Sequence, residues 1–523
     1  MKNLFTFCLP LLLCCACIGQ GALEKEGPGG VPDPEVAHGM IVLGDQLEDP
    51  YSVENMSKAL AALYPTKADR VVLPATDLYV RFLPADDLQL RLLRELGIEL
   101  TDHPVDYEIV REGDWYHDPG VPEDRITWQY AVVPKDFQFP SKVRYEVLDE
   151  CYIPDAASTK ADGVDWAAVE REAFLQTGNA ALLAAATKAA TSSAKPQGRI
   201  TIVDSDLGRK EGVKGVRVSC NTFVKFAHAF TDEEGCYAMS KSFASQPRYR
   251  LVFQNSAGFE IGFNLLLTPA SVSTLGKGEA TGLDAEITQD SERKLFSRCV
   301  VNNAGYDFYQ RCRKADPSVK TPPSNLRIWL FQRLSTGCAM MMQQGVLFEE
   351  LGVKKLLGEY ADLLKTFLPD LTIGLRGLDS YHDIYAQALH EFAHASHFML
   401  AGSDYWEHYA RFVVKSFVTS GFVTYGMGTE EDHGYCEVGE MWAYFCQTML
   451  CRERYGSDNP AYGLNHWFRP QIFLMLEERG LGPEKIFQVL SSDVSDREVL
   501  QKKLKSYYPE YKSVINQAFA RYN

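Results

Sequence analysis

The chain has 523 residues, of which 46% are hydrophobic and 23% charged, and its formal net charge is −16. This composition is that of an ordinary globular protein with room for about three domains. The acidic balance argues against nucleic-acid binding, and against binding of anionic membrane surfaces by the folded domains.

The first seventeen residues predict an export signal. Their apolar core, residues 4–13, is too short to span a bilayer as a mature helix. The sequence Cys-Cys-Ala-Cys that follows resembles the lipoprotein box of bacterial envelope proteins, which implies lipidation of Cys17. Lipidation of Cys15, or ordinary cleavage to a soluble secreted protein, are the alternatives. We therefore expect a lipid-anchored protein of the bacterial cell envelope, on the outer membrane with a periplasmic or surface face, in which residues 18–35 form a Gly/Pro-rich tether.

In residues 36–175, some segments show the helical spacing of apolar residues and others alternate apolar and polar residues as strands do. This mixture predicts an α+β domain. The expected elements are helices at 52–63 and 86–96 and strands at 70–73, 78–83, 107–111 and 126–133. No group of catalytic side chains stands out, so a pro-domain, an inhibitory cover and a docking module all remain open. An alanine-rich connector at 176–196 follows.

Residues 197–290 predict an all-β domain, because strands of alternating polarity are separated by Gly and Asp turns. The strand Gly-Val-x-x-Val-x-Val at 212–218 precedes the hairpin Thr-Asp-x-x-Gly-x-Tyr at 231–237. These motifs resemble the carboxypeptidase-regulatory, or transthyretin-like, β-sandwich. The resemblance implies a non-catalytic spacer or binding module.

The last unit, residues 295–523, is predicted to be mostly helical, and one of its helices carries the motif His-Glu-x-x-His. A capping box at its start and Gly402 at its end delimit this helix. Because residues four apart share a helix face, His390 and His394 can bind one zinc ion while Glu391 lies beside the open coordination position. The alternative is a helix of the hydrophobic core whose two histidines are hydrogen-bonded within the protein and bind no metal. Further helices are expected at 469–479, 483–490 and 497–507.

A catalytic zinc site needs a third protein ligand. His397 lies on the same face but about 10 Å along the axis from His390, so we expect it to pack nearby without binding the ion. Glu437 and Glu440 share one face of a second apolar helix, where a buried charge is costly unless it is paired or bound to metal. The residues alone leave open which of the two is the ligand.

The two motifs together resemble the gluzincin metallopeptidases, in which a Glu on a later helix completes the zinc site. The match is His390-Glu-Phe-Ala-His394 with Glu440-Met-Trp-Ala, within residues 295–523. It implies that Glu440 is the third ligand, that Glu437 orients an imidazole, and that each chain binds one Zn²⁺. The metzincin pattern is excluded, because it needs His-x-x-Gly-x-x-His after the first pair and residues 395–397 are Ala-Ser-His.

The resemblance also implies the chemistry. Glu391 would act as general base on a zinc-activated water, and the substrate would be a peptide or protein. These families usually add a Tyr or His that stabilises the oxyanion, for which the candidates are His433, Tyr425, Tyr435 and His466. A short strand predicted at 371–377 would either pair with substrate backbone, as in those families, or simply connect two elements.

The sequence thus predicts a multidomain protein: an α+β N-terminal domain, an all-β transthyretin-like sandwich and a mostly α-helical gluzincin-like catalytic domain. The competing hypothesis is a non-enzymatic envelope lipoprotein, for adhesion or nutrient binding, with a structural or vestigial zinc site. The presence of Glu391 argues against it, because a structural site needs no general base. An amidase or peptidase acting on cell-wall peptides also fits the motif. The sequence contains no nucleophile elbow, phosphate loop or dinucleotide fingerprint.

Overall fold

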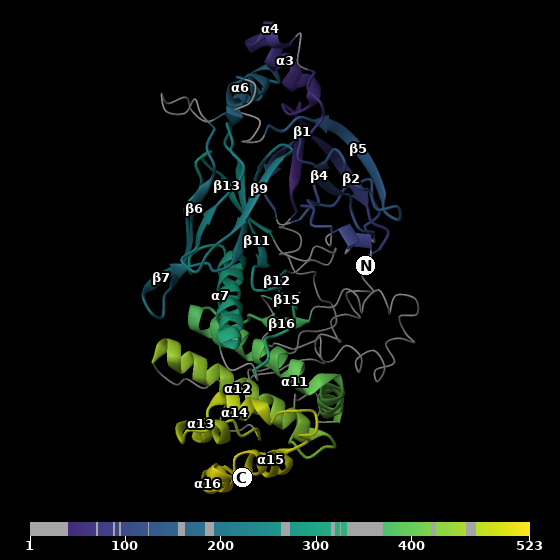
Figure 1. Ribbon diagram of the computed structural model, residues 1–523. Helices are drawn as coiled ribbons and strands as arrows, with labels where there is room; N and C mark the ends of the chain where they lie inside the picture. Colours follow the sequence, from purple (N-terminus) through teal and green to yellow (C-terminus); the bar gives the residue numbers. More distant parts are fainter. Residues whose placement is uncertain are drawn as a thin grey trace.

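The computed structural model describes residues 40–522, apart from 69–71, 87–88, 91, 94–95, 114, 124, 155–162, 184–192, 263–271, 315–318, 325, 332–369, 420–424 and 457–466 (Figure 1). The predicted signal with Cys17, the tether and His466 lie outside the described residues, as do residues 184–192 of the alanine-rich connector. Within the described part, no helix has the length and apolar character needed to cross a membrane.

The N-terminal unit combines helices with antiparallel strands, as predicted. Its elements are β1 (Val42–Gln46), α3 (Val53–Leu63), α4 (Pro65–Ala68), β2 (Asp77–Leu83), β3 (Tyr107–Arg111), β4 (Gln129–Pro134), β5 (Arg144–Cys151) and α6 (Trp166–Gln176). β2 lies between β4 and β5, and β1 pairs with β3. The strand predicted at 70–73 is not formed at its described residues 72 and 73, because the adjacent Pro74 lacks the N–H that a ladder bond needs.

The middle unit is built from strands. They are β6 (Gln197–Asp204), β7 (Arg209–Gly212), β8 (Val216–Thr222), β9 (Lys225–Phe230), β10 (Cys236–Ala238), β11 (Arg248–Asn255), β12 (Phe259–Ile261), β13 (Val272–Lys277) and β14 (Ala285–Ile287). One sheet has the order β10-β6-β14 with β7 on β6, and a second contains β9, β8, β11 and β12 with β13 on β11. The hairpin predicted at 231–237 forms only its turn, in which Asp232 Oδ1 accepts the backbone N–H groups of Glu234 and Cys236 at 3.0 and 2.7 Å. The strand after the turn, β10, pairs with β6 and not with the preceding β9.

The second sheet continues into the C-terminal part of the chain. β12 pairs in parallel with β15 (Leu326–Phe331), which pairs in parallel with β16 (Leu371–Gly374). One hydrophobic core cluster contains residues from Ile200 to Phe519. The middle and last units therefore share a sheet and a core, which contains residues from both sides of the boundary predicted at 290–295. β16 is the outermost strand of this path among the described residues, and all four of its residues are buried.

The C-terminal region is mostly helical, as predicted, and lies at the opposite end of the molecule from α3, α4 and α6 (Figure 1). Its helices are α7 (Arg293–Lys314), α11 (Tyr381–Thr419), α12 (His433–Tyr455), α13 (Gln471–Glu478), α14 (Pro483–Gln488), α15 (Arg497–Tyr507) and α16 (Lys512–Arg521). The predicted helix end at Gly402 is a break within α11: this residue has φ 77° and ψ 176°, and helical structure resumes after it.

Close packing of α7 fixes the position of α11. A Cβ atom at Gly305 of α7 would lie 2.6 Å from the ring of Phe392, in the middle of the His-Glu-x-x-His motif, and 2.6 Å from the ring of Phe259 on β12. Only glycine permits this approach. The sheet, α7 and the motif helix therefore meet at one point of the core.

Charged contacts join the N-terminal unit to the middle sheet. Lys225 of β9 forms a buried ion pair of 2.8 Å with Glu170 of α6. Glu99 contacts Arg217 at 3.0 Å and His228 at 3.1 Å. Burial on its own would raise the pKa of Glu99, but the hydrogen bond from His228 and the charge of Arg217 outweigh it and lower this pKa from 4.5 to about 2.

This contact generates a pH-dependent prediction. We expect Glu99→Gln to lower the free energy of unfolding by about 1–3 kcal/mol at neutral pH, because Arg217 and His228 lose their carboxylate. The folded pKa lies below the unfolded value, so this stabilisation is fully present above about pH 4.5 and is lost as the pH falls toward 2. Guanidinium titrations of the wild type and the variant at decreasing pH measure the difference.

The matched control is Glu54→Gln, which removes the partner of an exposed ion pair with Lys58 and should leave stability unchanged. A stability difference between wild type and Glu99→Gln that stays constant from pH 7 to pH 3 would contradict the assignment.

Candidate metal centre

Three buried side chains from two packed helices meet at one point. His390 and His394 lie one turn apart on α11, and Glu440 lies on α12. The exposed fraction of each residue is 2% or less. The helix can be buried here because the residues around the two histidines in its sequence are apolar and also buried, namely Leu389, Phe392, Ala393 and Ala395.

The distances between the donor atoms match those around one tetrahedral ion. The two imidazole Nε2 atoms are 3.1 Å apart. Glu440 Oε2 lies 3.4 Å from His390 Nε2, and Oε1 lies 3.4 Å from His394 Nε2. Ligands about 2.0–2.1 Å from a tetrahedral metal are about 3.3 Å from one another. The two glutamate distances involve different oxygens, and the group as a whole could hold one metal ion.

The protonation states of two of the three side chains favour metal binding. Burial would raise the pKa of Glu440, but the two imidazoles outweigh it and hold this pKa well below its usual range. Burial lowers the pKa of His394. An ionised carboxylate and a neutral imidazole are the forms that bind a cation, so little proton release opposes binding at these two ligands. The third is His390: burial would lower its pKa, but the hydrogen bond with Glu440 outweighs burial and raises it.

Two tyrosines contact the carboxylate of Glu440. The hydroxyl of Tyr409, on the second half of α11, donates to Glu440 Oε1 at 2.5 Å. The hydroxyl of Tyr425 donates to the same oxygen at 2.9 Å. Both tyrosines are buried.

Glu391 lies between the two histidines in sequence and is fully buried. Gln387, one turn earlier, donates to its Oε1 at 3.1 Å. Its Oε2 has no hydrogen-bond partner among the described residues. Burial, together with the charge of Glu440, raises the pKa of Glu391 to about 8 in the metal-free site. A carboxyl group with such a pKa can both accept and return a proton near neutral pH.

The structure gives the other motif residues different partners. Glu437 Oε1 lies 2.7 Å from Arg497 Nε, so its contact is with α15. Burial raises the pKa of Glu437 to about 7, against the opposing charge of Arg497. His397 donates through Nε2 to the backbone carbonyl of Leu490 at 2.9 Å, and burial lowers its pKa to about 3. His397 is thus a neutral core residue.

Of the candidate oxyanion donors, Tyr425 reaches the metal-ligand group, where its hydroxyl contacts Glu440. His433 donates through Nδ1 to the carbonyl of Glu430 at 2.8 Å. The ring of Tyr435 stacks on His408 with centroids 4.5 Å apart. Among the residues that the structure describes, no contact identifies an oxyanion donor.

Three neighbours of the site were not predicted from the sequence. Gln387 and Tyr444 lie one turn from Glu391 and Glu440 respectively, and helical periodicity could have indicated both. The ring of Tyr444 lies 4.5 Å from that of His390. Tyr409 follows the break at Gly402, so no local pattern places it at the site.

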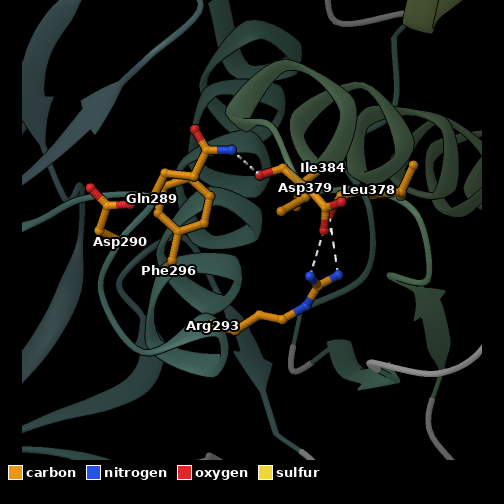
Figure 2. A pocket seen from close by; sticks show the side chains of 7 residues that line it. All are labelled: Gln289, Asp290, Arg293, Phe296, Leu378, Asp379 and Ile384. Carbon is orange, nitrogen blue, oxygen red and sulfur yellow. Dashed lines mark hydrogen bonds and ion pairs between the residues drawn. The ribbon is translucent and has the colours of Figure 1, made fainter.

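A surface pocket of about 310 Å³ lies nearby, where the first turns of α7 and α11 meet (Figure 2). Two of its charged side chains are paired, with Arg293 Nη1 2.5 Å from Asp379 Oδ1, and the amide of Gln289 donates to the backbone carbonyl of Asp379 at 2.7 Å (Figure 2). The three metal-ligand candidates are not among its lining residues. The pocket is therefore separate from the metal-ligand group.

Comparisons with known proteins add little. No protein-family model matches the chain. No curated protein matches it either. Among solved structures, a 9R-lipoxygenase from Cyanothece PCC8801 aligns with 8% identity and a TM-score of 0.14, over 65% of this chain and 70% of the lipoxygenase chain. A similarity this weak carries no information on fold or function, so the resemblances to gluzincins and to transthyretin-like sandwiches stay predictions.

Zinc affinity distinguishes the role of Glu440 from that of Glu437. We expect Glu440→Gln to weaken zinc binding at least about 100-fold, because loss of a ligand exceeds the 10–100-fold effect of losing an outer hydrogen bond. The control Glu437→Gln should bind zinc like the wild type, because its contact is with Arg497. Competition with a chromophoric chelator measures both affinities. Equal losses in the two variants would contradict the assignment of Glu440.

Proposed function

We propose that this protein is a zinc metallopeptidase of gluzincin type, in which His390, His394 and Glu440 hold one Zn²⁺ per chain. The observation that carries the proposal is the set of donor distances, 3.1, 3.4 and 3.4 Å, formed by the residue types that bind catalytic zinc. When bound, the ion would supply a water of lowered pKa and polarise the substrate carbonyl.

Glu391 has the position and chemistry of the general base. It neighbours the ligand His390 in sequence, and its Oε2 is not used by any hydrogen bond of the described residues. Gln387 holds its other oxygen. Glu391 takes a proton from the attacking water and then donates it to the leaving amine of the peptide.

The ligand count supports a catalytic role over a structural one. Structural zinc sites usually have four protein ligands, whereas catalytic sites have three and an open position. Within the described part of the chain, the group contains three candidate ligands. The fully buried Glu391 beside them has no use in a purely structural site.

The lipoprotein-type signal supports a place for this activity at the bacterial cell envelope, with Cys17 lipidated and the enzyme held at the membrane by that anchor. The N-terminal unit and the middle strands would then act as spacers or docking modules ahead of the peptidase. The expected substrates are peptides or proteins, including cell-wall peptides.

A single substitution tests the catalytic assignment. We expect Glu391→Gln, in residues 18–523, to retain one zinc ion and to lose at least about 100-fold of the peptide-cleaving activity of the wild type, because the general base is removed. Metal analysis and cleavage of a mixed quenched-fluorescent peptide library measure the two properties. Glu437→Gln is the control that should retain both.

Equal turnover by the wild type and Glu391→Gln would rule out Glu391 as the base. Zinc in both proteins, with no peptide cleaved by either, would favour the non-enzymatic envelope lipoprotein with a structural site.

A further inference from the structure

The two tyrosines on Glu440 are brought to the site by unusual backbone geometry. Tyr409 follows His394 by fifteen residues, which would place it about 22 Å away along a straight helix. The rings of the two residues are nevertheless 6.1 Å apart. The break at Gly402, with φ 77° and ψ 176°, turns the second half of α11 back toward the motif, and this backbone conformation is open only to glycine.

Tyr425 is held in a strained conformation. Its φ of 64° lies in the left-handed region, which is rare and costly for a bulky residue. Its backbone carbonyl accepts the indole N–H of Trp467 at 3.0 Å, and its ring packs edge-on against Phe468 at 5.0 Å. Strain of this kind persists where the surroundings fix the residue, here with its hydroxyl aimed at Glu440.

Both hydroxyls donate to the same atom, Oε1 of Glu440, and a carboxylate oxygen has about two lone-pair positions. Each oxygen lies beside one histidine: Oε2 is 3.4 Å from His390 Nε2, and Oε1 is 3.4 Å from His394 Nε2. Room for the Tyr409 ring comes from Gly439, where a Cβ atom would lie 3.3 Å from it.

We propose that Tyr409 and Tyr425 are positioning residues: their two hydrogen bonds use the lone pairs of Glu440 Oε1, hold the carboxylate beside the two histidines, and leave Oε2 as the oxygen that binds the metal. The inference rests on the proposed metal site, but not on peptidase activity. Ligation by one oxygen keeps the number of protein donors at three and preserves the position for water. Without the two hydroxyls, the carboxylate would rotate and bind less well.

The test is zinc affinity in Tyr409→Phe and Tyr425→Phe, measured by chelator competition on residues 18–523. We expect each variant to lose about 10–100-fold in affinity, the effect typical of hydrogen bonds to metal ligands. Tyr405→Phe is the matched control: Tyr405 is buried on the same helix, but its hydroxyl donates to the carbonyl of Tyr435 at 2.6 Å. It should bind zinc within about threefold of the wild type.

Thermal unfolding of the metal-free proteins separates positioning from folding. The metal-free Tyr409→Phe and Tyr425→Phe variants should unfold within a few degrees of Tyr405→Phe, about the change that a loss of 1 kcal/mol produces. Wild-type zinc affinity in both variants would overturn the positioning role while leaving the metal site intact. A wild-type protein that binds no zinc would overturn the proposed function as well.

Discussion

The carboxylate of Glu440 is the group on which the architecture of the site depends. A fully buried charge is costly, and it is tolerated only with close partners. Here the partners come from three places in the chain: the histidines of the first half of α11, Tyr409 of its second half, and Tyr425 before α12. A bound cation would complete this compensation. The contacts that compensate the charge of Glu440 therefore also hold α12 against α11.

Two glycines make this arrangement possible. Gly305 lets α7 and the sheet approach the ring of Phe392, which fixes the motif helix from one side. Gly402 breaks α11 so that this one segment contributes two candidate ligands, His390 and His394, and also Tyr409, whose hydroxyl donates to the third candidate, Glu440. The rigidity of the centre follows from the shared core, since the sheet that begins in the middle unit ends at β16, next to the residues that lead into α11. A site held this way suits catalysis, which depends on fixed geometry.

The sequence predicted what depends on local periodicity, and it could not predict contacts between distant segments. His390 and His394 follow from the spacing of four residues, and the helices α13 to α15 follow from apolar periodicity. The resemblance favoured Glu440 over Glu437, but the contact of Glu437 with Arg497, sixty residues away, follows from no local pattern. Gly402 was identified as the end of a helix, but the direction of the next helix, and hence the place of Tyr409, depends on tertiary packing. The parallel pairing of β12 with β15 is likewise a long-range contact.

The most direct test of the central claim is anomalous X-ray scattering at the zinc absorption edge from crystals of the wild-type protein grown with zinc. The account predicts one strong peak within about 2.0–2.2 Å of His390 Nε2, His394 Nε2 and Glu440 Oε2. A peak that is bound by other residues, or the absence of any peak at this group in zinc-containing crystals, would contradict the account.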